Sequence, residues 1–313
     1  MIFKNKNGEI RSGWVITIIL AVWFLAIFFT GYLVSFFINY RIKAEAFANY
    51  DLYIDAFYAY FFGPIGSTLR YLPQIAILLL AFWLIYRRPF KQLGLYKDKI
   101  VRHLLLGGLF GIVLITLQVS LLLILGAARI ESIDFVNIAA GPFWGIFINY
   151  AYVGVFEEIL ARGIMMTALK TTRIKWVIVV IPAVIFGVLH GLNNNVTLFS
   201  LVNVSLVGLL FAYLFIKTGH LWTPIGLHIT WNFTMGGIFG ISVSGNDHSS
   251  AAANVMFTGP DWLTGGDFGL EGGVICTFVI VAGLAFTHFF IRQSKEFWTF
   301  ESDMPLAIVT SKE

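Results

Sequence analysis

Long apolar runs with almost no charge make up most of this chain, and they limit the folds that it can adopt. A helix needs about 20 apolar residues to cross the roughly 30 Å of hydrocarbon in a bilayer. Eight runs are candidates for such helices: 14–38, 71–86, 103–126, 143–169, 174–190, 197–216, 221–240 and 272–291. The sequence therefore predicts an all-α, polytopic membrane helix bundle with about eight transmembrane helices.

The composition agrees with a membrane protein and argues against soluble classes. Only 12% of the residues are charged and 58% are hydrophobic, whereas a soluble domain carries about 25% charged residues. A transmembrane barrel would show short alternating segments in place of unbroken runs. We therefore exclude a cytosolic enzyme, a disordered chain and a nucleic-acid-binding domain, and we expect membrane lipid to be the main partner.

Basic residues predict the orientation. If both termini are cytoplasmic, the inner segments hold sixteen of the 21 Lys and Arg residues, the outer segments hold four, and Arg162 lies inside a span. This asymmetry follows the positive-inside rule. We expect one integral domain over 1–313, with a cytoplasmic tail at 293–313, in the plasma membrane of a bacterium.

Two neighbouring acids lie deep in the fourth run. Glu157 and Glu158 are followed by Arg162, while we place the other fifteen acids, Glu271 among them, in loops, tails or span edges. A charge at mid-bilayer costs roughly 2.5–3.5 kcal/mol, so such residues mark functional sites and face the bundle interior. They predict a polar cavity at the centre of the bundle.

Helical spacing separates these three residues into two groups. Glu158 and Arg162 stand at i and i+4, so they share a face and can pair. That pair can serve as a structural ion pair between helices or as part of a functional site. Glu157 lies about 100° away around the helix, where its carboxylate can act as a general base.

Two further spans each bring a histidine to the same region. His190 lies one helical turn after Phe186, and His228 lies one turn before Asn232. Either pair alone can be a hydrogen-bonded helix contact, which contributes about 0.6 kcal/mol on average. Carboxylates, imidazoles and an amide on three spans together suit the activation of a water and the binding of an oxyanion. His190 is expected near the outer end of its span, so the span must tilt for His190 to reach Glu157.

The order of these motifs is similar to that of a known family. Glu157-Glu158-x-x-x-Arg162, Phe186-x-x-x-His190 and His228-x-x-x-Asn232, in this order on three hydrophobic spans, resemble the CPBP family. This family comprises the type II CAAX prenyl endopeptidases and bacteriocin-processing proteins, also called Abi. The motifs occupy the core at about 143–240. The stretch Thr264–Gly272 resembles the loop that such proteins carry before their last helix.

The resemblance implies an intramembrane endopeptidase that cleaves a membrane-associated, CAAX-like peptide or a membrane-anchored protein. Its catalytic residues would be Glu157, Glu158, His190, His228 and Asn232. Glu157 and His190 would activate the water, His228 and Asn232 would stabilise the oxyanion, and Glu158, with Arg162 and Phe186 in support, would fix the catalytic helix. The family is commonly labelled a metalloprotease, so Glu157, His190 and His228 could form a three-ligand zinc site. We favour hydrolysis without a metal, because the sequence has no His-Glu-x-x-His motif and a water held by Glu157 and His190 needs no metal.

Two other functions remain compatible with the same residues. Buried Glu, His and Arg side chains also form proton relays in secondary carriers, although carriers usually show inverted repeats and we find none. A non-catalytic membrane scaffold or immunity protein is the third hypothesis. The third run also contains Gly107 and Gly111 in a GxxxG pattern, which predicts a close helix contact.

Overall fold

The computed structural model of the chain describes residues 10–41, 57, 60–61, 63–139, 141–247 and 250–294. Its helical segments coincide with the eight predicted runs. These segments are α1 (Ser12–Arg41), α3 (Pro64–Tyr86), α4 (Ile100–Ile124), α6 (Gly141–Glu158) with its continuation η3 (Ile159–Met165) and α7 (Met166–Leu169), α8 (Lys175–Leu189), α9 (Leu198–Thr218), α10 (Trp222–Asn232) with η6 (Phe233–Ile238), and α12 (Val274–Phe290). The predicted polytopic helix bundle is confirmed.

Five of these helices are long and apolar enough to cross a membrane: α1, α3, α4, the helix at Lys175–Leu192 and α9. The other candidates are shorter or interrupted. α12 has 17 residues, and α6 and α10 each pass into a π-helical segment after 18 and 11 residues. The chain is an integral membrane protein, and the count of eight spans stays a prediction, as does the single domain over 1–313.

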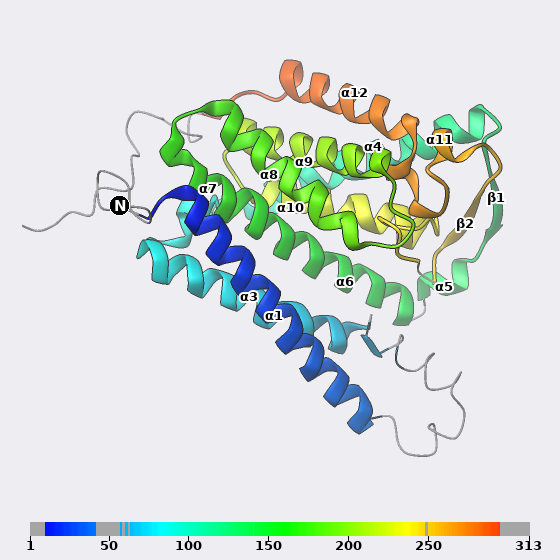
Figure 1. Cartoon of the computed structure of the whole chain (residues 1–313). Helices are drawn as coiled ribbons and strands as arrows, with labels where there is room; N and C mark the ends of the chain where they lie inside the picture. Colours follow the sequence, from blue (N-terminus) through cyan, green and yellow to red (C-terminus); the bar gives the residue numbers. More distant parts are fainter. Residues whose placement is uncertain are drawn as a thin grey trace, which may run out of the picture.

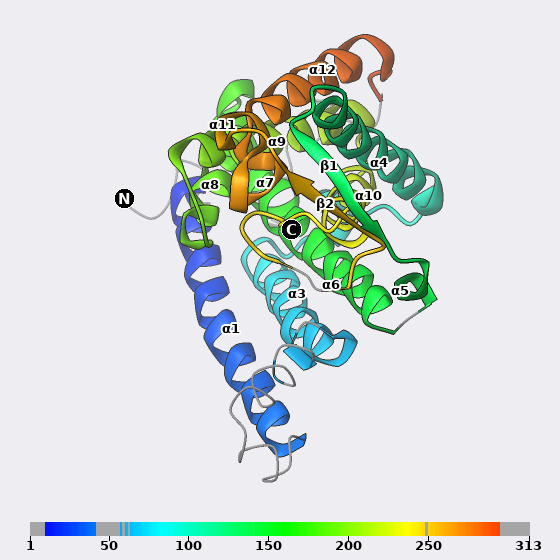
Figure 2. The ribbon, with the colours of Figure 1, turned by 90° about the vertical axis from the view of Figure 1, so that its right-hand side faces the viewer.

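The helix α10 lies at the centre of the bundle. It packs against α4, α6 and α9, while α12 covers α4 and α9 on the outside. α1 and α3 form a pair on the other side of α6, and the lower end of α1 projects from the body of the protein (Figures 1 and 2). This arrangement surrounds the polar residues of α10 with helices.

Glycines allow α4 and α10 to approach closely, as the GxxxG pattern predicts. A Cβ on Gly107 would meet the carbonyl oxygen of Thr223, and a Cβ on Gly226 would meet that of Leu104. Gly111 is equally close to Thr230. The GxxxG contact is therefore made within one chain.

The described residues between η6 and α12, 239–247 and 250–273, fold back onto the bundle. β2 (Ala253–Phe257) pairs antiparallel with β1 (Ala128–Ile133), which adds a small two-stranded sheet to the predicted all-helical fold. α5 (Phe135–Ala139) follows β1. After β2 come α11 (Asp261–Thr264) and the short turns η7 (Gly266–Phe268) and η8 (Leu270–Gly272), which lead back into the interior.

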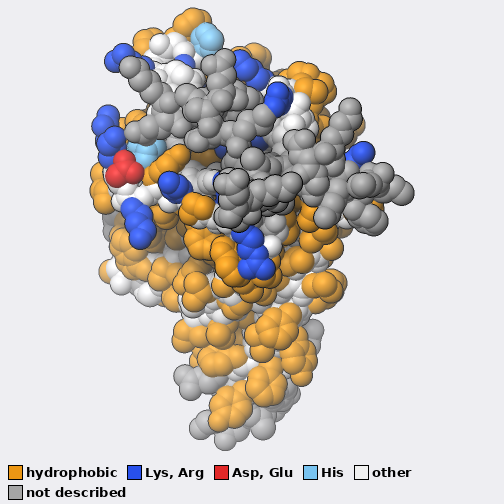
Figure 3. All heavy atoms as spheres, turned by 90° about the vertical axis from the view of Figure 1, so that its left-hand side faces the viewer, with side chains coloured by type: hydrophobic (Ala, Val, Ile, Leu, Met, Phe, Trp, Pro, Cys, Tyr) orange, Lys and Arg blue, Asp and Glu red, His pale blue; other side chains and the backbone are white. Residues whose placement is uncertain are grey.

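Basic side chains gather at one end of the bundle. Figure 3 shows Lys and Arg around this end, with apolar side chains covering much of the remaining surface in that view. η2 (Phe90–Leu93) and η4 (Lys170–Thr172) are short turns of this basic end. The distribution suits the predicted cytoplasmic side. The orientation of the termini stays a prediction, and the tail beyond residue 294 lies outside the described residues.

Candidate active site

One cavity of about 400 Å³ collects the polar residues of the bundle. Glu157, His190, His228 and Asn232 all line it, and so does Phe186. They come from α6, the end of α8 and α10. α10 packs against α6 and α9, and α8 packs against α9 and η3. The predicted convergence of the three motifs in one central cavity is therefore present in the structure.

The neighbouring acids Glu157 and Glu158 point in different directions, as their helical spacing predicts. The side chain of Glu157 is 25% exposed and borders the cavity, whereas that of Glu158 is fully buried. Glu158 therefore serves the interior of the protein, and Glu157 is the carboxylate that a substrate or a water can reach.

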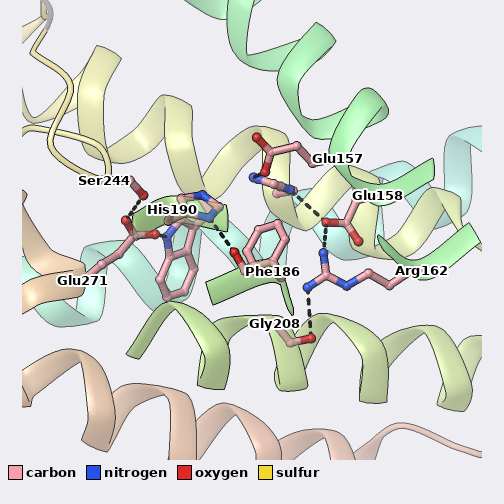
Figure 4. A network of polar contacts seen from close by, with 10 residues as sticks. Glu157, Glu158, Arg162, Phe186, His190, Gly208, Ser244 and Glu271 are labelled. Atoms are coloured by element: carbon pink, nitrogen blue, oxygen red, sulfur yellow. Dashed lines mark hydrogen bonds and ion pairs between the residues drawn. The ribbon is translucent and has the colours of Figure 1, made fainter. Parts of the chain in front are cut away.

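Glu158 is the centre of a buried charge network (Figure 4). Arg162 donates from Nη1 to Glu158 Oε1 over 2.7 Å and from Nη2 to the carbonyl oxygen of Gly208 over 3.0 Å. The guanidinium also stacks on Phe186, 4.4 Å from the ring centre. The predicted i, i+4 pair is confirmed, and the contacts of Arg162 with Gly208 and Phe186 tie this helix to α9 and α8.

His228 connects the two acids. Its Nδ1 lies 2.9 Å from Glu158 Oε1, and its Nε2 lies 3.8 Å from Glu157 Oε2. Because a carboxylate only accepts hydrogen bonds, Nδ1 carries the proton that it donates to Glu158. When His228 is also protonated at Nε2, its charge and that of Arg162 balance the two carboxylates.

His190 reaches the cavity because α8 ends there and continues into η5 (His190–Leu192). Its Nδ1 lies 2.7 Å from the carbonyl oxygen of Phe186. A carbonyl accepts, so Nδ1 donates, and Nε2 of the neutral ring is left as an acceptor. Phe186 thus orients His190 with its backbone and holds Arg162 with its ring, which gives the supporting role inferred for Phe186 a physical basis.

π-Helical segments directly follow α6 and α10, the helices of the Glu157 and His228 motifs. η3 begins one residue after Glu158, and η6 begins one residue after Asn232. Such segments are rare and occur frequently at functional sites. Neither was predicted, because a π-helical segment depends on tertiary packing as well as on the local sequence.

The cavity also contains residues that the sequence did not single out. Arg70 was expected outside the membrane, but it lies within α3, lines the cavity and donates to Asn149 Oδ1 over 2.9 Å. Glu271 was expected in the outer segment, but it is only 4% exposed and lines the cavity with Ser244. Arg70 directly precedes the predicted run 71–86, so an earlier start of that span would have placed Arg70 within the membrane. Nothing in the local pattern of Glu271 predicted its burial.

The residues do not have the arrangement of a metal centre. Among the described residues, no three His, Cys, Asp or Glu side chains are grouped so that they could hold a metal ion. Donation from Nδ1 of His228 to Glu158 and from Nδ1 of His190 to the Phe186 carbonyl leaves Nε2 of each ring as the atom that could bind a metal. The zinc set of Glu157, His190 and His228 is thus not assembled among the described residues, and it stays a prediction.

Comparison with known proteins identifies the segment that carries the motifs. Residues 139–234, about a third of the chain, match the family model described as type II CAAX prenyl endopeptidase Rce1-like. The match contains all three motifs and confirms their resemblance to the CPBP family. No curated protein and no solved structure matches the chain significantly.

Proposed function

Since residues 139–234 carry the Rce1-like segment, we propose that the protein is an intramembrane endopeptidase that uses a glutamate-activated water. The observation that supports this most strongly is the single cavity lined by Glu157, His190, His228 and Asn232. The substrate would be a membrane-associated peptide or protein of CAAX type, in line with the family description. The bacterial plasma membrane and cytoplasmic termini belong to the same proposal.

In the first step, the carboxylate of Glu157 takes a proton from a water in the cavity. The oxygen of that water attacks the scissile carbonyl carbon, and the carbonyl oxygen becomes an oxyanion. His190 is placed beside the cavity with Nε2 as an acceptor, so it can help to orient the water. General base catalysis of this kind contributes about 10²–10⁴-fold to the rate.

In the second step, the oxyanion is stabilised and the amine leaves. Asn232 supplies an amide N–H, and His228 supplies an N–H from Nε2 when it is protonated. Donors that are held in place in a low-dielectric site need no reorganisation as charge develops. The C–N bond then breaks, and protonated Glu157 transfers its proton to the leaving amine, which restores the carboxylate.

The role of Glu158 and Arg162 in this proposal is to fix the geometry. Glu158 orients His228 through Nδ1, and Arg162 neutralises Glu158. Both side chains are buried, with at most 1% of their surface exposed. Glu158, which the resemblance placed with the catalytic residues, is therefore a positioning residue here.

The test is Glu157→Gln in purified protein reconstituted into liposomes, with cleavage of an internally quenched, farnesylated CAAX peptide as the readout. The amide has nearly the same shape but cannot take a proton, so we expect cleavage to fall at least about 100-fold. Glu131→Gln, on the exposed strand β1, is the matched control and should cleave normally.

The same experiment separates the competing functions. Normal cleavage by Glu157→Gln would refute the general-base role. A wild-type protein that cleaves neither this peptide nor any protein in a comparative membrane proteome, while it takes up substrate in an ion-dependent manner, would indicate a carrier. A wild-type protein with neither activity would indicate a scaffold.

A further inference from the structure

Glu271 is a buried carboxylate that lines the cavity together with Glu157, and the mechanism above does not use it. It precedes α12, at the end of a loop in which Gly265, Gly266 and Gly269 have φ values of +100°, +54° and +94°. Residues other than glycine rarely adopt such positive φ values. At Gly269, moreover, a Cβ would collide with the carbonyl oxygen of Ser242. The glycines therefore allow the loop to turn inward and bring Glu271 to the cavity.

The backbone around Glu271 is held rigidly. Buried Asn203 on α9 donates from Nδ2 to the carbonyl oxygens of Glu271 and Gly273, over 2.9 Å in each case. Thr277 on α12 donates to Asn203 Oδ1 over 2.7 Å. Since the backbone is fixed from two helices, the carboxylate of Glu271 has a defined position.

The two oxygens of this carboxylate engage two different parts of the site. Oε1 accepts from the indole Nε1 of Trp231 over 3.0 Å, and Oε2 accepts from the hydroxyl of Ser244. In Figure 4, Glu271 and Ser244 lie on one side of His190, and Glu157, Glu158 and Arg162 lie on the other. Glu271 thus connects α10 with the loop that borders the cavity.

The connection to α10 reaches the residues assigned to the oxyanion. Trp231 directly precedes Asn232, and its ring packs against Phe211, which in turn packs against His228 at a ring distance of 5.2 Å. Trp231 is only 1% exposed. If its indole lost the carboxylate, a buried N–H would be left without an acceptor, which is unfavourable. Rotation of α10 to recover an acceptor would displace Asn232 and His228.

The connection to Ser244 fixes the border of the cavity near His190. Ser244 has a φ of +48°, which is uncommon for a residue other than glycine. Its carbonyl oxygen accepts from Asn193 Nδ2 over 2.9 Å, three residues after His190. Gly245 donates its N–H to the carbonyl oxygen of Phe268 in the glycine-rich loop. The Ser244 conformation therefore depends on Asn193, after α8, and on the glycine-rich loop that contains both Phe268 and Glu271.

We propose that Glu271 is a positioning residue for the proteolytic site. It acts through Trp231 on the oxyanion-binding face of α10 and through Ser244 on the border of the cavity. The expected effect of Glu271 on catalysis rests on the proposed function. The structural content of the inference, that Glu271 sets the position of Trp231 and His228, can be tested without any activity.

The kinetic test compares three variants in the peptide assay. Glu271→Ala removes both acceptors, and we expect kcat to fall about 100-fold with little change in KM, because a displacement of about 1 Å can have this effect. Glu271→Gln should stay within a few-fold of wild type, since its amide oxygen can accept from Trp231 and its amide nitrogen can donate to Ser244. Trp231→Phe keeps a ring but loses the N–H, so its kcat should fall to an intermediate value.

Matched controls separate this role from a general loss of folding. Asp267→Ala removes an exposed carboxylate from the same loop, and Trp262→Phe removes an exposed indole from α11. Both should retain wild-type kcat. If Glu271→Ala does not fold, Trp231→Phe and Ser244→Ala, which each remove one of the two donors, carry the test.

Two kinetic results would overturn the proposal. One is a wild-type kcat for Glu271→Ala per folded molecule, which would make Glu271 a purely structural residue. The other is a Glu271→Gln variant as inactive as Glu271→Ala, together with an altered pH profile, which would assign a proton-transfer role to Glu271.

A spectroscopic readout distinguishes failure of this inference from failure of the proposed function. The indole N–H resonance of Trp231, assigned by its loss in Trp231→Phe, and the imidazole resonances of His228 should shift in Glu271→Ala and return close to their wild-type positions in Glu271→Gln. Unchanged His228 resonances in Glu271→Ala would overturn the inference even if the protease assay succeeds. Shifted resonances in a protein that cleaves nothing would support the inference and refute the proposed function.

Discussion

The two helices that carry the Glu157 and His228 motifs, α6 and α10, are held in the bundle by different forces. α6 continues into η3, and that junction is fixed by the buried pair of Glu158 and Arg162 and by the Gly208 carbonyl. α10 is fixed by close contact with α4, where glycines bring the backbones together. One helix is thus held by charge and the other by steric fit.

The difference predicts how each helix responds to change. A buried ion pair depends on both partners, because removal of one leaves an uncompensated charge in a low-dielectric interior. A substitution at a glycine contact leaves no charge unpaired. Its effect on stability depends on the volume that the new side chain adds. Substitutions at the two helices should therefore differ in size and in the way they can be rescued.

The largest effect is expected at the charged junction. Arg162→Met should destabilise the folded state by about 3–5 kcal/mol, because Glu158 would remain buried without its cation. Unfolding in detergent, followed by circular dichroism, measures the loss. The double variant Glu158→Gln/Arg162→Met removes both charges and should recover a large part of it. If the double variant is no more stable than Arg162→Met, α6 is not held by charge.

The glycine contact should respond with a smaller loss. Gly226→Ala would push a methyl group against the backbone of Leu104, so α4 and α10 would have to separate. We expect about 1–3 kcal/mol, as for other overpacked sites. Gly31→Ala, on α1 with open space around it, is the control. Because alanine favours a helix more than glycine does, this variant should keep or slightly raise the stability in the same unfolding experiment. An equal loss in the control would show that the contact with Leu104 does not set the effect.

The smallest effect concerns the polar part of the same contact. Thr230 donates from Oγ1 to the carbonyl oxygen of Gly108 on α4 over 2.8 Å. Thr230→Val keeps the shape and should cost about 0.6 kcal/mol, the average for hydrogen bonds between membrane helices. Thr230→Ser keeps the hydroxyl and serves as the control. A loss of several kcal/mol in Thr230→Val would mean that α10 is held mainly by hydrogen bonding.

The same contrast explains which parts of the site could be predicted. Glu158 and Arg162 are neighbours on one helix, so their pairing follows from 3.6-residue periodicity. The steric contact of α4 was visible as Gly107 and Gly111. The connections of Glu271 involve Trp231 and Ser244, which are 40 and 27 residues away, and no local pattern encodes such a pairing.

The sequence by itself determined that the chain is a membrane helix bundle and that Glu157, His190, His228 and Asn232 are its candidate catalytic residues. Apolar length and the cost of burying charge in lipid are properties of local segments, so they can be read without a structure. Tertiary structure alone decided that His228 lies between Glu157 and Glu158, that Phe186 orients His190, and that Glu271 and Arg70 enter the cavity. These contacts depend on how helices cross and on where a glycine-rich loop turns inward, and packing among distant segments fixes both.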